Sequence, residues 1–305
     1  MSGSAVITDV EEPAPRRVIP VDKSSGRGAH SRGARARITR FLLYAILFVF
    51  ALWYLTPIYV LLVTSLKPSS AVRLDTMWQL PWPPSLDGFF AAWKSLEPNF
   101  LNSLKLAIPA AAISSVVGSL NGYVLAKWKF RGADTLFTLI LFGMFIPYQA
   151  ILIPLTQVMS NVGLYGSLQG LILVHIIYGI PITTLIFRNY YAGIPTELLE
   201  AAKVDGAGFF RIYRSILLPL SASGFVVVLI WQFNSVWNDF LFAVTLTTQQ
   251  NWPVTVALNN LAGSFSVDWN VQMAGALLAA LPTLLIFIIL GRFFVRGLLA
   301  GSLKG

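Results

Sequence analysis

The sequence contains no cysteine, and charged residues make up only 11% of its 305 residues. Without cysteine the chain has no disulfide framework and no thiol nucleophile. Charged residues account for about a quarter of an average soluble domain, so this chain has too few of them to cover a water-exposed surface. Hydrophobic residues make up 56% of the chain and the mean hydropathy is +0.69. These values indicate an integral membrane protein.

Residues for metal or phosphate chemistry are also scarce. The two histidines, His30 and His175, are too few for a histidine-based metal site when cysteine is absent. A phosphate-binding loop needs Gly-Lys followed by Ser or Thr, and the dipeptide Gly-Lys occurs nowhere in the chain. We therefore expect no metal, no bound cofactor and no catalytic residue on this chain.

Long runs without charge predict the membrane spans. A charged side chain at the bilayer centre costs roughly 2.5 to 3.5 kcal/mol, and about 20 apolar residues suffice to cross. The uncharged stretch 135–187 is too long for one crossing, and the turn-forming residues 160–167 divide it. The pattern predicts an all-α integral membrane fold with six transmembrane helices at about residues 41–66, 100–126, 135–159, 168–188, 220–246 and 269–291.

The distribution of lysine and arginine predicts the orientation of these spans, because cytoplasmic loops carry an excess of both. Most of the 22 lysines and arginines lie before residue 41, between the second and third spans, at Arg188 and in the adjoining segment 189–219, or at the C-terminus. The remainder, on the opposite side, are Lys67, Arg73, Lys94 and Lys105. Both termini and the segment 189–219 are therefore expected to face the cytoplasm.

Two polar segments each allow two interpretations. Residues 1–38 are rich in Ser, Gly, Pro and Arg without an apolar period, so we expect a disordered basic cytoplasmic tail. It is either a positive-inside anchor near membrane lipid or a specific recognition element, and it gives no reason to expect a nucleic-acid partner. Residues 67–99, rich in Pro and Trp, are either an interfacial aromatic belt or a landing surface for a substrate-delivering protein.

The segment 189–219 has the pattern of a docking helix followed by a return into the membrane. Glu200-Ala201-Ala202 lies in a short predicted helix that starts at Pro195 and ends at Gly206. Leu198, Ala201, Ala202 and Asp205 share one face of that helix, where the alanines allow a partner to come close. A second apolar stripe and Ile216-Leu217-Leu218-Pro219 follow. The alternative is a helix lying on the membrane surface whose small residues are accidental.

This spacing resembles the EAA coupling loop of importer permeases of the ATP-binding cassette superfamily. The resemblance covers about residues 38–305 and is closest to the MalG-like carbohydrate importer permeases. It rests also on Asn102-Ser103-Leu104, Tyr123 to Gly132 (YVLAKWKFRG), Trp237-Asn238-Asp239-Phe240 and the C-terminal run from Gly297 to Gly305.

The resemblance implies a transport assembly in the inner (cell) membrane of a bacterium or archaeon. The expected partners are a second, homologous permease subunit forming a heterodimer, two ATPase subunits and an extracytoplasmic sugar-binding protein. ATP and Mg²⁺ would be bound by the ATPases, not by this chain. The residues expected to couple to the ATPase are Glu200, Ala201, Ala202, Asp205, Gly206, Phe209 and Tyr213.

A polar and aromatic cluster in the fifth span is the candidate substrate pathway, because sugars need hydroxyl partners and aromatic faces. Its members are Trp231, Gln232, Asn234, Trp237, Asn238 and Asp239. The alternative for Asp239 is an interfacial carboxylate or an interhelical hydrogen bond. We assign His175 and Asn121 to helix packing, and the spacing of Gly118 and Gly122 is either a close helix contact or ordinary glycine usage.

The expected function is the permease subunit of an ATP-driven sugar importer that works by alternating access. The C-terminal third is similar to the glucose/mannose branch of these importers. Three alternatives stay open: an importer of this architecture for another small solute, an ion-gradient-driven secondary carrier, and a structural membrane subunit without a pathway.

Overall fold

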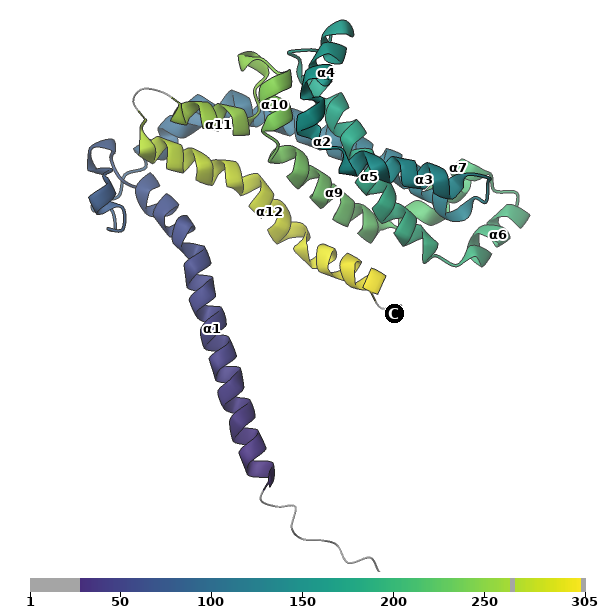
Figure 1. Cartoon of the computed structure of the whole chain (residues 1–305), viewed down its shortest axis with the longest axis horizontal. Coiled ribbons are helices and arrows are strands. Elements are labelled where there is room, and N and C mark those ends of the chain that lie inside the picture. Colours follow the sequence, from purple (N-terminus) through teal and green to yellow (C-terminus); the bar gives the residue numbers. More distant parts are fainter. Residues whose placement is uncertain (1–27, 264–266, 303–305) are drawn as a thin grey trace, which may run out of the picture. The chain divides into compact units, whose positions relative to one another are not determined.

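The computed structural model describes residues 28–263 and 267–302 (Figure 1). All regular secondary structure in these residues is helical. The one β-bridge among them, between Gly166 and Thr247, is isolated. The predicted all-α membrane fold is therefore confirmed. The α-helices are α1 Gly28–Ser65, α2 Asp87–Lys127, α3 Ala133–Phe142, α4 Tyr148–Asn161, α5 Leu168–Ala192, α6 Thr196–Val204, α7 Phe209–Ile212, α8 Leu218–Leu220, α9 Ala222–Trp237, α10 Leu241–Leu246, α11 Val254–Ala262 and α12 Trp269–Ser302. Between them lie a π-helix, η5 (Tyr213–Leu217), and the 3-10 turns η2 (Ser69–Ala71), η3 (Leu74–Thr76), η4 (Gly143–Phe145) and η6 (Gln249–Asn251).

The chain divides into two units, residues 1–57 and 58–305. In the first unit, α1 already begins at Gly28, so residues 28–38, predicted to be disordered, are helical. Alanine and arginine, which are frequent in this stretch, are good helix formers and continue the helix of the first span. The rest of the predicted tail, residues 1–27, lies outside the described residues. The side chains of α1 from Phe41 to Leu55 are mostly exposed, as expected for a helix that meets lipid or a partner.

In the described part of the chain, four helices are long and apolar enough to cross a membrane, and two further pairs qualify as bent spans. The four are Arg37–Ser65, Asp87–Lys127, Leu168–Ala192 and Trp269–Arg292, and the pairs are Ala133–Phe145 with Tyr148–Asn161 and Phe209–Leu220 with Ala222–Trp237. Counting each pair as one span allows six crossings. The second helix starts at Asp87 rather than near residue 100, because Pro98 and Pro109 are both accommodated inside it.

The third and fifth predicted spans are not continuous helices. The third bends by 97° between Phe145 and Tyr148. Pro147 cannot donate a backbone hydrogen bond, and it forces Ile146 into an extended conformation with ψ 117°. The fifth bends by 79° near Ser221 and then stops at Trp237, well before the predicted end at residue 246. The carboxylate of Asp239 accepts from backbone N–H groups of the next helix, which offers the backbone an alternative to helix continuation.

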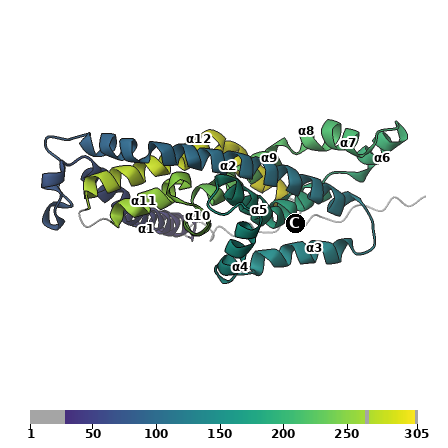
Figure 2. The same cartoon turned by 90° about the horizontal axis from the view of Figure 1, so that it is seen from above.

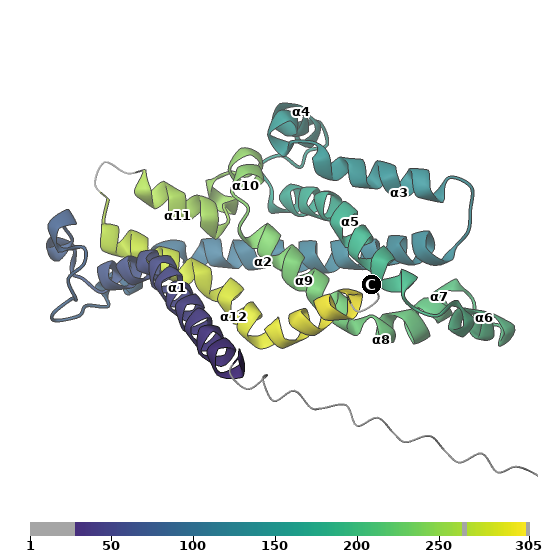
Figure 3. The same ribbon diagram turned by 60° about the horizontal axis from the view of Figure 1, so that its bottom comes forward.

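The second unit is built around the contact of α2 with α5, which also packs against α3 (Figure 3). A β-carbon added at Gly118 would lie 2.0 Å from Thr183 Oγ1, and one at Gly122 would lie 2.7 Å from the backbone nitrogen of Arg188. The Gly118 and Gly122 spacing is therefore a close helix contact, in which the missing side chains let the two backbones approach. Thr183 Oγ1 also donates to the carbonyl of Ser114 across this contact, at 3.0 Å.

Helix α2 carries different partners at its two ends (Figure 2). Near its N-terminal half, Asn99 and Asn102 donate to the carbonyl of Trp252, and the backbone N–H of Val254 donates to Ser103 Oγ, which holds the start of α11. At its C-terminal end, Lys127 Nζ donates to the carbonyl of Ile194, just before α6. The segment 189–219 and helix α11 therefore lie at opposite ends of α2.

The loop 66–86 is held by a buried lysine. Lys67 Nζ donates to the carbonyl of Thr76 at 2.6 Å, and burial lowers the pKa of this ammonium below its usual value. Trp78 stacks on Tyr59 with ring centroids 6.5 Å apart, while Trp82 is exposed. The two interpretations of this segment, aromatic belt or landing surface, both remain compatible with these contacts.

The close contact at Gly118 generates a prediction about stability. Gly118→Ala should destabilise the protein by roughly 1 to 3 kcal/mol, because the new methyl group overpacks the contact between α2 and α5. Gly291→Ala is the matched control, since a β-carbon there meets nothing within 4 Å in another membrane helix. Thermal unfolding midpoints of the purified variants measure the difference. Equal midpoints for both variants would contradict the contact.

Candidate functional site

Residues 194–219 are the part of the segment 189–219 that follows α5. They begin with α6, which ends as the sequence predicted. Gly206 has φ +78°, its N–H donates to the carbonyl of Lys203, and the N–H of Ala207 donates to the carbonyl of Ala202. These are the two hydrogen bonds of a Schellman cap, which requires a left-handed residue at this position. Apart from Gly206 and its two chain neighbours, no described residue has an atom within 4 Å of a β-carbon built there, so the backbone conformation is what demands glycine.

One face of α6 is exposed and the other is buried. Glu200, Ala201, Asp205 and Gly206 are exposed, whereas Ala202 is half-buried against a cluster that includes the buried Leu199. The predicted face is thus divided, because Ala202 packs inward. Three large apolar side chains also lie on the exposed side: Leu198, Val204 and Phe210, which are 47%, 88% and 74% exposed. Sequence reasoning missed Val204 and Phe210, because they lie outside the periodic stripe.

Phe209 and Tyr213 turn toward the chain's own helices. The Phe209 ring stacks on Tyr123 of α2 at 4.7 Å and meets the edge of Trp128 at 5.5 Å between centroids. The Tyr213 ring stacks on the same Tyr123 at 6.2 Å. These two side chains, predicted to couple to an ATPase, therefore attach the segment to α2 instead of projecting from it.

A buried hydroxyl network continues this attachment. Tyr213 OH donates to Ser119 Oγ of α2 at 3.0 Å, and Ser119 Oγ shares a 2.6 Å hydrogen bond with Tyr191 OH of α5. Tyr191 OH shares a further hydrogen bond of 3.2 Å with Ser221 Oγ at the start of α9. The π-helix η5 and helices α2, α5 and α9 meet in this network. Sequence reasoning missed it because each hydroxyl comes from a different segment.

A cavity of about 440 Å³ opens where α9 stops. It is bounded by α5, by the last turns of α9, by the break at residues 238–240 and by the start of α4 and α10. Its lining residues are Tyr148, His175, Tyr178, Gly179, Ile182, Trp231, Gln232, Ser235, Val236, Asn238, Asp239, Phe240, Leu241 and Phe242.

The structure divides the predicted pathway cluster by helix periodicity. Trp231 and Asn238 are seven residues apart and line the cavity, and the amide of Asn238 donates to Asn234. Trp237 points elsewhere, although it was predicted in the pathway: it is buried, its Nε1 donates to the carbonyl of Ala279 at 3.0 Å, and it lines a second, mostly apolar cavity of about 300 Å³. Adjacent residues of a helix are turned about 100° apart, so these six residues, which are spread over positions 231–239, cannot all share one face.

Gln232 connects the cavity to α2. Its Nε2 donates to Ser114 Oγ at 2.9 Å, and its side chain is buried. A β-carbon at Gly179 would lie 1.9 Å from that Nε2, so the glycine of α5 makes room for the contact. Ser114 lies on the same helix as Ser119 of the hydroxyl network. The cavity and the segment 194–219 are therefore tied to one helix by buried polar contacts.

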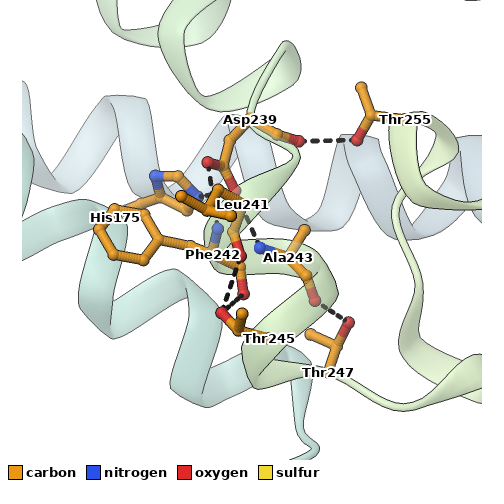
Figure 4. Close-up of polar contacts among 8 residues, drawn as sticks. All are labelled: His175, Asp239, Leu241, Phe242, Ala243, Thr245, Thr247 and Thr255. Atoms are coloured by element: carbon orange, nitrogen blue, oxygen red, sulfur yellow. Dashed lines mark hydrogen bonds and ion pairs between the residues drawn. The ribbon is translucent and has the colours of Figure 1, made fainter. Parts of the chain in front are cut away.

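Asp239 organises the break between α9 and α10 (Figure 4). Its Oδ2 accepts from the N–H of Ala243 at 3.0 Å, and its carbonyl accepts from Thr255 Oγ1 at 2.7 Å. His175 Nε2 of α5 lies 3.4 Å from Asp239 Oδ2, and this nitrogen has no hydrogen bond of normal geometry. Of the alternatives for Asp239, the interhelical contact is present, and the carboxylate also lines the cavity. His175 was assigned to packing, but it lies at the cavity beside Phe242.

Among residues 28–263 and 267–302, no three histidine, aspartate or glutamate side chains come together in a group that could hold a metal ion. Asn121 Nδ2 lies 3.5 Å from Thr184 Oγ1, which places it in the contact between α2 and α5.

The segment 194–219 and the residues that line the cavity both lie within the part of the chain that matches a known family. Residues 115–299 match the family model described as binding-protein-dependent transport system inner membrane component. A probable ABC transporter permease of Pyrococcus horikoshii is 51% identical over 88% of this chain and 98% of its own length. A xylose/arabinose import permease of Haloferax volcanii is 35% identical over 86% and 92%. A glucose import system permease of Saccharolobus solfataricus is 32% identical over 89% and 98%.

Solved structures give the same fold. A chain of a bacterial ABC transporter involved in the import of the acidic polysaccharide alginate superposes with a TM-score of 0.72, at 22% identity over 85% of this chain and 97% of that chain. A chain of the alginate transporter in complex with its pentasaccharide-bound periplasmic protein superposes with a TM-score of 0.62, at 16% identity over 83% and 94%.

The hydroxyl network generates a second prediction. Ser119→Ala should destabilise the protein by about 1 to 3 kcal/mol, because the Tyr213 and Tyr191 hydroxyls both lose a buried partner. Ser115→Ala is the matched control: Ser115 is equally buried on α2, but its hydroxyl bonds only to the carbonyl of Ala111 in its own helix. Thermal unfolding midpoints compare the two. A larger loss for Ser115→Ala than for Ser119→Ala would count against the network.

Proposed function

This chain belongs to the family of binding-protein-dependent transport system inner membrane components, and on that premise we propose that it is the permease subunit of an ATP-driven carbohydrate importer. It is a multi-pass protein of the inner (cell) membrane. The observation that carries the proposal is that the segment 194–219, which contains the exposed helix α6, and the cavity where α9 stops are both hydrogen-bonded to α2, through Tyr213 and Gln232 respectively.

The exposed side of the segment 194–219 is suited to dock into an ATPase. Leu198, Val204 and Phe210 offer apolar area, while Ala201 leaves room for close approach. Helices that lie in a groove of a partner use such apolar anchors. Two ATPase subunits would bind ATP and Mg²⁺ and hydrolyse ATP, and this chain would contribute no catalytic group. The segment and both termini would face the cytoplasm, in line with the distribution of lysine and arginine.

The inward side of the segment contacts the membrane helices, so a movement of the docked partner would be transmitted to them. A displacement of α6 and α7 would reach α2 through the stack of Phe209 on Tyr123, and would reach α5 and α9 through the hydroxyl network. Such a rigid-body movement fits alternating access. The ATPase would need to bind the two states of the permease with different affinity, because equal affinity would shift neither.

The cavity is this chain's half of the substrate pathway in the proposal. Trp231 and Tyr178 provide aromatic faces, and Gln232, Ser235 and Asn238 provide hydroxyl partners. A second, homologous permease subunit would complete the pathway as a heterodimer, and an extracytoplasmic sugar-binding protein would deliver the solute. The names of the Haloferax and Saccharolobus relatives support a monosaccharide such as xylose, arabinose or glucose.

Uptake by reconstituted vesicles tests the function. The purified permease pair and the ATPase are reconstituted into vesicles, and ATP is supplied on the side of the membrane where the ATPase lies. Labelled sugar and the binding protein are added on the opposite side. Accumulation that needs ATP and persists with ionophores is the expected result. Accumulation that collapses with the ion gradient would indicate a secondary carrier, and uptake of amino acids or phosphate in place of sugar would overturn the carbohydrate assignment.

The cap at Gly206 generates a prediction about coupling. Gly206→Ala should strain the end of α6 by roughly 1 to 2 kcal/mol, because an L-residue disfavours a left-handed backbone. The displaced helix should lower sugar uptake per ATP hydrolysed several-fold.

Gly208→Ala is the matched control for this variant. Gly208 lies two residues away with equally open surroundings but φ −76°, a conformation that alanine adopts freely. Its ratio of uptake to hydrolysis should equal that of the unchanged protein. If Gly206→Ala also kept the full ratio, the role of the cap in coupling would be refuted.

A further inference from the structure

We propose, building on the function above, that the cavity at the end of α9 is a half-site for neutral saccharides and that Asp239 makes it reject anionic ones. The proposal goes beyond sugar transport as such, because it names the charge class that this chain admits and the side chain that sets it. It rests on the composition of the cavity wall and on the contacts of its one carboxylate.

The wall combines aromatic faces with neutral polar groups. Tyr148, Tyr178 and Trp231 are half-buried or exposed at the cavity, and rings of this kind cover the C–H faces of a sugar. Asn238 and Ser235 add donors and acceptors for hydroxyl groups. A wall of this kind suits a neutral polyhydroxylated ring, because the C–H faces of the ring can pack on the aromatic side chains and its hydroxyl groups can bond to Asn238 and Ser235.

The charges of the wall disfavour an anion. No lysine or arginine is among the described residues that line the cavity, and their ionisable groups other than tyrosine are His175 and Asp239. A neutral His175 leaves the wall with the negative charge of Asp239. A protonated His175 would form an ion pair with Asp239 at 3.4 Å, so its charge would not be available to a ligand. In neither state does the wall offer an unpaired cation to a carboxylate or phosphate.

Burial strengthens this rejection. The side chains of His175 and Asp239 are only 8% and 12% exposed, and charges repel more strongly where little water screens them. The carboxylate accepts hydrogen bonds from the N–H groups of Phe242 and Ala243, and the backbone carbonyl of Asp239 accepts a further one from Thr255 Oγ1. It therefore cannot turn away easily when an anionic ligand enters. The related fold of the alginate importer carries an acidic polysaccharide, so the fold alone does not decide charge.

Asp239→Asn isolates charge from structure. An asparagine side-chain oxygen can accept the same backbone hydrogen bond at the start of α10, and asparagine caps helices about as well as aspartate. The variant thus removes the negative charge and keeps the break between α9 and α10. Asp268→Asn is the matched control, because Asp268 is an exposed carboxylate that does not line the cavity.

Three probes of one ring size separate the charge classes: glucose, glucosamine and glucuronate. Their binding to the purified full transporter, without the binding protein, is followed by tryptophan fluorescence, and Trp231→Phe checks that the signal comes from this cavity. Glucose should bind at least ~10-fold more tightly than glucuronate, with glucosamine no weaker than glucose. Asp239→Asn should reduce the preference for glucose over glucuronate about tenfold, and Asp268→Asn should leave it unchanged.

Several outcomes would overturn this inference without touching the proposed function. They are equal binding of glucose and glucuronate by the unchanged protein, a preference that Asp239→Asn does not alter, and no saturable signal from any of the three sugars. ATP-dependent uptake by the same preparation is measured in parallel. If that uptake is present while the charge preference is absent, only the inference about Asp239 fails; if the uptake itself is absent, the importer proposal fails.

Discussion

The close packing of α2 against α5 is the contact on which the other features depend. Gly118 and Gly122 let the two backbones approach until no side chain fits between them, and in a membrane such contacts replace the hydrophobic driving force that water provides elsewhere. Helix α2 then carries Ser119 and Ser114 at fixed depths. Ser119 forms hydrogen bonds with the hydroxyls of Tyr213 and Tyr191, and Ser114 accepts one from the amide of Gln232.

This arrangement gives the molecule two regions with different surfaces, both hydrogen-bonded to α2. The end with α6 and α7 exposes apolar and small residues on one side and is attached by stacked rings and hydroxyls on the other. The other region is a cavity that exists because α9 stops early, where Asp239 diverts the backbone into α10. A polar side chain in a membrane helix is costly unless it is paired. This cost explains why Ser119, Tyr191 and Gln232 are each hydrogen-bonded to another helix.

Local features of the chain were predictable because they depend on neighbouring residues only. The helical membrane fold follows from long uncharged runs, since a charge at the bilayer centre is costly. The end of α6 at Gly206 follows from a glycine after an amphipathic turn, and the structure adds the two capping hydrogen bonds. The bend before Tyr148 was missed even though Pro147 is visible in the sequence, because proline is often accommodated within membrane helices, as Pro109 is in α2.

The sequence by itself determined that this is a helical membrane protein, that it contains no Gly-Lys dipeptide of a phosphate-binding loop, and that a short helix with a glycine stop follows Pro195. Only the tertiary structure decided which side chains meet: that Trp237 leaves the polar cluster for Ala279, that Tyr213 and Phe209 point inward, and that His175 joins Asp239 at a cavity. The physical reason is that composition and periodicity describe one segment at a time. Which face of a helix meets which neighbour depends on packing between segments distant in the chain, such as the glycine contact of α2 with α5.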